Sequence, residues 1–429
     1  MLRNALLFTM GLAVLSQANT LWSAETSAAD AAAPLIKCSP YLQAMDQNSV
    51  TVVWHTTRPS ISWVNYQEKG VAEEPMTAIS STYGLRDIGL IQKITLKDLK
   101  PGTTYTYEIN SKEVTKLEPY KFDFGAEESM KDKNGKTFTF TTWPENADTF
   151  SFVMINDLHD DNAKHEKLLK ATGADTAAFI CYNGDIEADK MNDNDMFTKF
   201  LNVPINTYAW EKCFFMLRGN HETRGAMSRR MHDYFPTKTD QFYYTFQYGD
   251  VFFVNLDCGE DKPDKNKEYG GLVDFDSYRT EQVEFLKKVV KMPEYKKARY
   301  RVFFCHIPPV GGQDSDLIIR KTNLDGTVED SKILAGDPWH GDQEIYNKFL
   351  PFMMDNKADL LLCGHYHRLF NTDYIQNGKV LPVLVNSNVH GTRVDITPEK
   401  ITYRIFDQDG KEIFSKDIPA RKKNRWKIF

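Results

Sequence analysis

The sequence of 429 residues contains few cysteines: six in all, and no two of them are spaced as C-x-x-C. Six are too few for a disulfide-stapled scaffold, and without the C-x-x-C spacing the usual zinc-knuckle and thiol redox motifs are missing. Four of the cysteines lie inside apolar runs, where cysteine commonly behaves as a small buried hydrophobe. We therefore do not expect the chemistry of this chain to depend on sulfur.

Basic clusters are also scarce. The 53 Lys and Arg are outnumbered by 59 Asp and Glu, which gives a formal net charge of −6, and no long run of Lys or Arg occurs. The chain thus lacks the charge pattern of a nucleic-acid-binding protein. Its 41% hydrophobic and 26% charged residues are typical of a globular protein, and its length predicts two or three domains.

Long apolar runs are missing as well. The apolar run of residues 5–15 is too short to cross a membrane as a helix. It follows Arg3 and precedes the small residues Ser16 and Ala18, the pattern of a secretory signal. We therefore predict a signal peptide over residues 1–24, a linker over 25–33, and an exported protein, periplasmic or secreted. No membrane span is expected once the signal is removed.

Residues 34–143 have the pattern of an all-β domain. Short strands are predicted at 49–54, 60–66, 105–109 and 137–142, with turn residues between them. Such regular short strands favour a β-sandwich. The segment 96–107 resembles the late-strand turn of fibronectin type III domains, and we find no cluster of chemically active residues in this region.

From residue 148 to 429 the pattern changes to strands alternating with helices, which predicts an α/β domain. A helix is predicted over 277–291, and the strands are continuous apolar runs of the kind covered on both faces. These runs are 150–155, 176–182, 213–217, 251–256, 301–305 and 360–363, followed by strands at 380–385 and 400–406. The stretch 308–341, rich in Gly, Asp and Pro, is expected to be a long loop.

Polar side chains follow five of these strands at the point where each strand ends. In open α/β sheets ligands bind outside the carboxyl ends of the strands, so we expect these side chains to meet in one place. They include five of the ten histidines. The residues are Asp157 and His159, Asp185, Asn220 and His221, His306, and His365 and His367. By contrast, His165 and His232 lie outside these groups and are expected at the surface.

The residue types in these groups point to metal chemistry. Asp carboxylates, an Asn amide and His nitrogens form a mixed ligand set that suits borderline divalent cations such as Mn, Fe, Co or Zn. Without His221, the seven remaining side chains are too many for one ion and about right for two ions that share a bridging carboxylate. Two close cations are the arrangement used for in-line displacement at phosphorus.

In the order D-x-H, G-D, G-N-H-E, H and G-H-x-H, these groups resemble the calcineurin-like metallophosphoesterase superfamily. The resemblance implies a catalytic domain of two packed mixed β-sheets flanked by helices, with two divalent ions (Fe, Mn or Zn). It implies that one ion is held by Asp157, His159, Asp185 and His367. It implies that the other is held by the bridging Asp185 together with Asn220, His306 and His365. His221 is then expected to give a proton to the leaving oxygen, and Glu222 to orient His221 or a metal-bound water.

The preceding β domain makes the chain similar to the purple acid phosphatase branch, with one departure. That branch carries D-x-G and G-D-x-x-Y, in which the tyrosine binds ferric iron. Here the glycine position is His159 and the tyrosine position is Ala188. A histidine thus takes the place of the tyrosine as a ligand. We therefore predict two divalent metal ions and no purple tyrosinate absorption.

Two further residues are candidates for substrate binding. Arg218, in L-R-G-N-H-E, resembles the arginine that contacts phosphate in serine/threonine phosphatases, although a salt bridge at a strand end explains it equally well. His340, beside Trp339 in the stretch 308–341, would contact substrate if that stretch forms the rim of the cleft.

The sequence as a whole predicts an exported phosphoesterase that hydrolyses small phosphate monoesters by attack of a metal-bound hydroxide. A phosphodiesterase or nucleotide hydrolase would use the same centre. An alternative of another class is a catalytically inactive cell-envelope binding protein, which is disfavoured because no predicted ligand is missing. The oligomeric state cannot be predicted.

Overall fold

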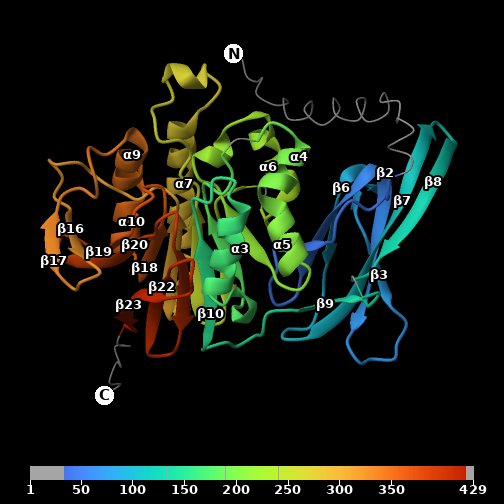
Figure 1. The fold of residues 1–429 in the computed structure, drawn as a ribbon, viewed down its shortest axis with the longest axis horizontal. Coiled ribbons are helices and arrows are strands. Elements are labelled where there is room, and N and C mark those ends of the chain that lie inside the picture. The colour runs from blue at the N-terminus through green and yellow to red at the C-terminus, as the bar shows by residue number, and fades with distance from the viewer. Residues whose placement is uncertain (1–32, 133, 189, 240, 422–429) are drawn as a thin grey trace, which may run out of the picture. The chain divides into compact units, whose positions relative to one another are not determined.

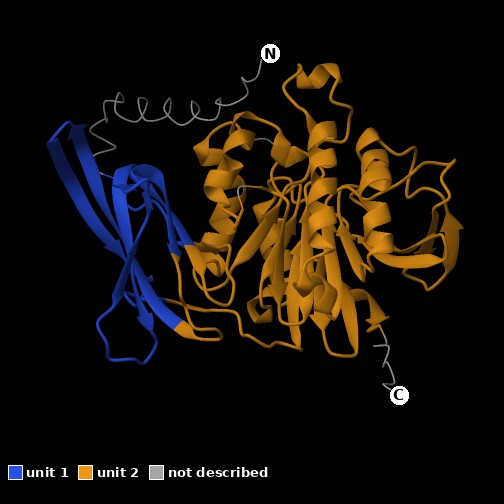
Figure 2. Ribbon diagram, turned by 180° about the vertical axis from the view of Figure 1, so that it is seen from behind, with its two compact units in different colours: residues 1–40, 52–95, 105–138 blue, residues 41–51, 96–104, 139–429 orange. Residues whose placement is uncertain are grey.

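The computed structural model describes residues 33–421 apart from residues 133, 189 and 240; the predicted signal peptide, 1–24, lies outside the described residues. The chain divides into two compact units (Figure 2). Unit 1 contains 52–95 and 105–138, whereas 41–51 and 96–104 group with 139–429 in unit 2. Within the described residues, no helix has the length and apolar character needed to cross a membrane.

The N-terminal region is all-β, as predicted. Its central strand β2 alternates buried and half-buried residues over much of its length, and the buried Trp54 donates its indole N–H to the Ser111 hydroxyl at 3.0 Å. The likeness to fibronectin type III domains stays a prediction. The sheet contains β1 (Tyr41–Gln43), β2 (Val50–Glu68), β3 (Met76–Ile79), β6 (Gly89–Leu96), β7 (Thr104–Glu118), β8 (Lys121–Met130) and β9 (Phe138–Thr141). A separate hairpin pairs β4 (Ser81–Thr82) with β5 (Leu85–Arg86).

Unit 2 contains two mixed β-sheets flanked by helices, as predicted (Figure 1). The first has the order β12 (Phe214–Leu217), β11 (Ile180–Asn183), β10 (Phe150–Ile155), β21 (Gly391–Ile396), β22 (Lys400–Phe406) and β23 (Glu412–Pro419). The second has the order β13 (Tyr244–Tyr248), β14 (Val251–Leu256), β15 (Tyr300–Cys305), β18 (Leu360–Cys363), β20 (Lys379–Val385), β19 (Phe370–Gln376), β16 (Ile318–Thr322) and β17 (Val328–Ser331). The strands that precede the polar groups are parallel to their neighbours within each sheet: β10 to β11 to β12, and β15 to β18.

The continuous apolar runs form strands because both of their faces are covered. In β14, the ring of Phe253 packs 5.4 Å from Phe152 of the other sheet, whereas Phe252 and Val254 join a core with the helices. That core includes Leu286 and Val289 of the predicted amphipathic helix. The helices are α3 (Asn162–Ala171), α4 (Asp193–Met196), α5 (Asn202–Thr207), α6 (Met231–Tyr234), α7 (Phe275–Val289), α8 (Pro293–Lys297), α9 (His340–Lys348) and α10 (Leu350–Asp355).

The strands predicted separately at 49–54 and 60–66 form one continuous strand, β2. Two other expectations about the fold were also wrong. The stretch 308–341 is not simply a loop, because β16 and β17 form a hairpin in it that extends the second sheet through β19. His165 is not a surface residue: it is buried on α3, with its Nε2 2.7 Å from the hydroxyl of Tyr182.

Candidate metal centre

The predicted ligands come together at the carboxyl ends of strands from both sheets. Asp157 and His159 follow β10, while Asp185 and Asn220 follow β11 and β12 of the same sheet. The second sheet contributes His306 after β15 and the pair His365 and His367 after β18. The parallel strand pairs bring these turns to the same edge, as the sequence pattern predicts.

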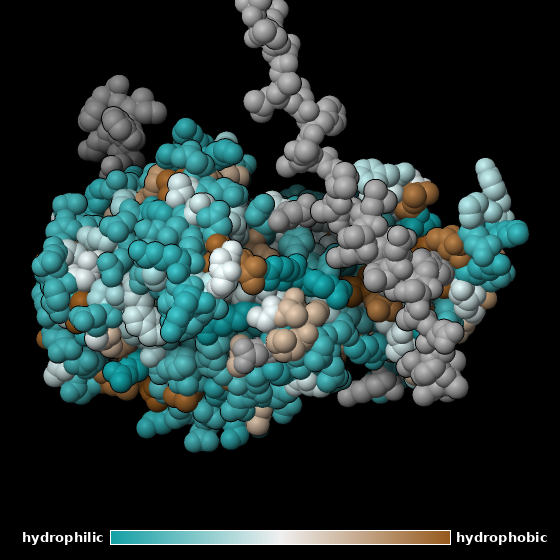
Figure 3. Space-filling view, turned by 90° about the horizontal axis from the view of Figure 1, so that it is seen from above, coloured by the Kyte–Doolittle hydropathy of each residue, from teal (hydrophilic) through white to brown (hydrophobic). Residues whose placement is uncertain are grey.

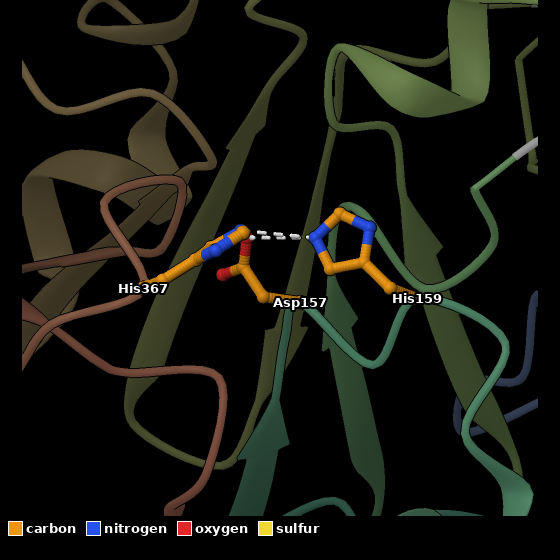
Figure 4. Close-up of side chains that lie close together, drawn as sticks. All are labelled: Asp157, His159 and His367. Atoms are coloured by element: carbon orange, nitrogen blue, oxygen red, sulfur yellow. Dashed lines mark hydrogen bonds and ion pairs between the residues drawn. The ribbon is translucent and has the colours of Figure 1, made fainter.

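Three side chains form the first cluster, in which Asp157 lies between His159 and His367 (Figure 4). Asp157 Oδ1 is 3.2 Å from His367 Nε2 and 3.8 Å from His159 Nε2, and the two Nε2 atoms are 2.9 Å apart. Asp157 is fully buried, whereas both histidines are partly exposed. The cluster is therefore shielded from solvent at its carboxylate and open to solvent at its two histidines.

The second cluster is formed by Asp185, His306 and His365. His306 Nε2 lies 3.1 Å from Asp185 Oδ2 and 3.9 Å from Asp157 Oδ1, so this imidazole stands between the two buried carboxylates. The amide of Asn220 lies 3.2 Å from Asp185 Oδ2 and 3.1 Å from His365 Nδ1. All seven predicted ligands thus take part in two adjoining clusters.

Neighbouring groups orient these side chains so that their remaining donor atoms face one another. His306 Nδ1 is 2.7 Å from the carbonyl of Asn183, which accepts its proton and turns Nε2 towards the centre. Asp157 Oδ2 accepts from the His365 backbone N–H, and Asp185 Oδ1 from that of His221. Asp157 Oδ1 and His306 Nε2 are buried, and their nearest polar neighbours are other side chains of the centre, His367 Nε2 at 3.2 Å and Asp185 Oδ2 at 3.1 Å.

Asp157 Oδ1 and His306 Nε2 are suited to bind divalent cations. Two carboxylates that are 0% and 1% exposed would carry negative charge in a site with little solvent, which is unfavourable unless a positive charge lies beside them. The Asn220 amide can turn its nitrogen towards Asp185 when no cation is present and its oxygen towards a bound cation. Oxygen and imidazole donors in this combination suit Mn, Fe or Zn.

The pKa values of Asp185 and His306 also show that the site favours a positive charge. Burial favours a higher pKa for Asp185, but the surrounding histidines, His306 foremost, hold the pKa of this carboxyl well below its usual range. Burial would lower the pKa of His306, yet Asp185 and Asp157 raise it to about 10. Burial, and then the neighbouring His306, lower the pKa of His365 to about 3. Without a metal, a proton on His306 therefore supplies positive charge beside Asp157 and Asp185. A bound cation would supply that charge instead.

The backbone at the site is strained. Five of the seven predicted ligands have positive φ angles: Asp157, His159, Asp185, His365 and His367. Non-glycine residues adopt this conformation rarely, and they do so mostly where function requires it. Two motif glycines are explained by close approach, because a Cβ on Gly219 would clash with Asp185 Oδ1 and one on Gly364 would lie 2.6 Å from Asp157 Oδ2.

Glu222 has a different role from the one expected. Its buried carboxylate accepts backbone N–H groups of Asp185 at 2.7 Å, Ile186 at 3.0 Å and Gly219 at 2.7 Å. It therefore ties the loop after β11 to the loop after β12, rather than orienting His221 or a water. The sequence placed Glu222 in the motif but gave no sign of these partners.

His221 stands at the open side of the centre, and a residue missed by the sequence analysis lies beside it. The Nδ1 of His221 is 3.2 Å from the carbonyl of Ala188, and its Nε2 is 3.0 Å from the Nη1 nitrogen of Arg224. Arg224 also forms a two-pronged ion pair with the buried Glu260, at 2.7 and 2.9 Å. The spacing of three residues from His221 across a 3₁₀ turn, His221–Thr223, is the signal that could have identified it.

Arg218 and His340, the two predicted substrate contacts, each lie beside an aspartate. The guanidinium of Arg218 is 2.6 Å from Asp257 Oδ2 and stacks 4.2 Å from the ring centroid of Phe242, so the salt bridge weighed in the sequence analysis is present. The imidazole of His340 is 2.8 Å from Asp276 Oδ1. Their substrate-binding roles stay predictions.

Comparison with known proteins agrees with the fold. Residues 150–369 match the family described as calcineurin-like phosphoesterase, and residues 38–142 match the purple acid phosphatase N-terminal domain. No curated protein matches the chain significantly in sequence.

Among solved structures, a purple acid phosphatase from yellow lupin (Lupinus luteus) seeds superposes with a TM-score of 0.55 at 13% identity, over 89% of this chain and 74% of that one. This likeness supports the fold alone. A protein from Thermus thermophilus has a TM-score of only 0.34 at 10% identity, covering 63% of this chain and 99% of its own, and adds no argument. Because the phosphoesterase family matches more than half of the chain and its motif residues converge in two clusters, this protein belongs to the calcineurin-like phosphoesterase family, with the domain architecture of purple acid phosphatases.

Proposed function

We propose that this protein hydrolyses phosphate monoesters with two divalent cations bound by the seven side chains of the two clusters. The observation that carries the proposal is the pair of adjoining clusters, in which buried ligand atoms of Asp157 and His306 face other predicted ligands. When bound, two such cations polarise the phosphoryl oxygens and activate a water as nucleophile. Their identity, among Fe, Mn and Zn, is left to metal analysis.

The chain's own residues supply binding and proton transfer. Asp185, central to the second cluster, would bridge the two ions. His221 is held at Nδ1 by the Ala188 carbonyl, and its Nε2, which lies 3.0 Å from the Nη1 of Arg224, would meet the leaving oxygen once that guanidinium turns to the phosphoryl group. The Arg224 guanidinium beside that Nε2 would donate to the phosphoryl oxygens, while Glu260 fixes its orientation.

A comparison of substrates tests the reaction. We expect metal-reconstituted protein to hydrolyse 4-nitrophenyl phosphate faster than bis(4-nitrophenyl) phosphate. A diester rate above the monoester rate would replace the proposal with a phosphodiesterase. Metal-dependent binding without turnover of either compound would instead support the inactive binding protein.

Export is the second part of the proposal and rests on residues 1–24 of the sequence. Expressed in a bacterial host with the full N-terminus, the protein should be recovered outside the cytoplasm with a new N-terminus near residue 19 or 25. N-terminal sequencing of the recovered protein would check this. Retention of Met1 on cytoplasmic protein would contradict it.

A further inference from the structure

A pocket of about 470 Å³ opens directly beside the metal centre. It is lined by Asp337, Trp339, Tyr366, Arg368 and the predicted ligands His365 and His367. A phosphoryl group held at the two clusters would therefore place one of its substituents next to this pocket. The pocket has no assigned role in the proposed chemistry.

Its most unusual wall is Trp339. The indole is 54% exposed although it lies 5.0 Å, centroid to centroid, from the imidazole of His365. Most of the surface seen in Figure 3 is hydrophilic, with hydrophobic side chains only scattered over it. A large exposed aromatic ring beside a predicted metal ligand has the features of a binding group.

The backbone that carries Trp339 is held beside the centre by Asp342. The fully buried Asp342 accepts the backbone N–H of Trp339 at 2.8 Å through Oδ2. The same oxygen accepts the hydroxyl proton of Tyr366 at 2.9 Å, and Tyr366 lies between His365 and His367 in the chain. One buried carboxylate thus links the start of α9 to the loop that carries two predicted ligands, which preorganises the pocket.

Apart from the two histidines, the charged side chains that line the pocket are Asp337 and Arg368. Arg368 is exposed, and none of the ion pairs found among the described residues includes it. Its guanidinium can therefore stack on a planar ring or donate to polar ring substituents. Trp339 and Arg368 both offer a flat face to a planar ring.

We infer that Trp339 forms a subsite for the alcohol part of the substrate and selects phosphate esters that carry a planar aromatic ring. The inference rests on the proposed phosphoesterase function and adds the class of leaving group to it. Stacking of one ring on an aromatic side chain contributes enough to change affinity by about 5- to 30-fold. Trp339 is a specificity residue, since nothing places it at the reacting atoms.

Binding of non-hydrolysable phosphonates tests the inference without relying on turnover. Titration calorimetry on metal-reconstituted protein should give phenylphosphonate a Kd about 5- to 30-fold lower than methylphosphonate. Trp339→Ala should remove this difference and leave the methylphosphonate Kd and the metal content unchanged. Trp339→Phe, the matched control that keeps a ring, should retain most of the difference.

Three other outcomes have separate meanings. Equal affinity of the wild type for both phosphonates would overturn the subsite while leaving the phosphoesterase proposal intact. An equal loss of both affinities in Trp339→Ala would also overturn it, since the residue would then act on the centre as a whole. If metal-loaded wild type binds neither phosphonate, the proposed function itself fails, and the subsite with it.

Discussion

At the scale of single residues, the centre differs from the purple acid phosphatase pattern by one exchange of ligands. His159 projects into the first cluster, 2.9 Å from His367, while the tyrosine position is Ala188, whose N–H is bonded to Asp160 Oδ1 at 2.9 Å. An imidazole in place of a phenolate keeps the number of ligands but removes the group that absorbs visible light when it binds ferric iron.

This exchange predicts the colour of the iron-loaded protein. Reconstituted with iron under air, the wild type should lack a strong visible tyrosinate band in its absorption spectrum. The double variant His159→Gly/Ala188→Tyr restores the purple pattern and should gain the band, which makes it the positive control. A strong band in the wild type would contradict the ligand set.

The two arginines near the site predict different effects on catalysis. Arg224→Ala should lower kcat/KM for a phosphate monoester about 10- to 100-fold, because a charge-assisted contact to the phosphoryl group is lost. It should also lower the stability, because it leaves the buried Glu260 without its ion pair. Arg218→Ala should lower the free energy of unfolding by about 3 kcal/mol with KM unchanged, since it leaves the buried Asp257 unpaired. Kinetics and urea denaturation of both variants check this pair. If Arg218→Ala had normal stability and a raised KM, Arg218 would be the residue that contacts the phosphate.

At the scale of elements, the loops at the strand ends are held together by one carboxylate. Glu222 accepts N–H groups from the loops after β11 and β12, so it keeps Asp185 and Asn220 in register. Glu222→Gln replaces one accepting oxygen with an N–H donor that faces other N–H donors. We expect metal affinity to fall about 10- to 100-fold, as for other groups that support metal ligands. Unchanged metal affinity by competition with a chelator would show that the loops hold their shape without Glu222.

The elements that the sequence predicts well are those whose signal is local. The apolar runs at 150–155, 251–256 and 360–363 coincide with β10, β14 and β18, because strands buried on both faces need unbroken apolar residues. The polar groups that follow them could be placed at one edge, since parallel strands end together.

Other features depend on partners far along the chain and left no local signal. The strand β21 pairs antiparallel with β10 although the two lie far apart in the sequence. His165 is buried because Tyr182 and the Phe200 ring cover it, and nothing in its own neighbourhood indicates this. The partners of Glu222 are backbone groups, which a sequence pattern does not identify.

At the scale of the whole molecule, the centre requires both sheets of unit 2. Asp157 and Asp185 come from the first sheet, while His306 and His365 come from the second, so neither sheet could bind the pair of ions alone. The net charge of −6 does not prevent phosphate binding, because bound cations dominate the local charge. The central claim is therefore that two cations occupy this junction and that hydrolysis depends on them.

Metal analysis of the purified protein together with its phosphatase activity tests that claim most directly. We predict two equivalents of divalent metal per chain in the wild type. In Asp185→Asn, bound metal should fall and activity should decrease at least about 100-fold. Asp359→Asn is the control, because Asp359 is buried just before β18, at the end of that strand opposite to His365. This variant should retain the bound metal and the activity. A wild type without bound metal, or an Asp185→Asn protein with full metal content and full activity, would contradict the account.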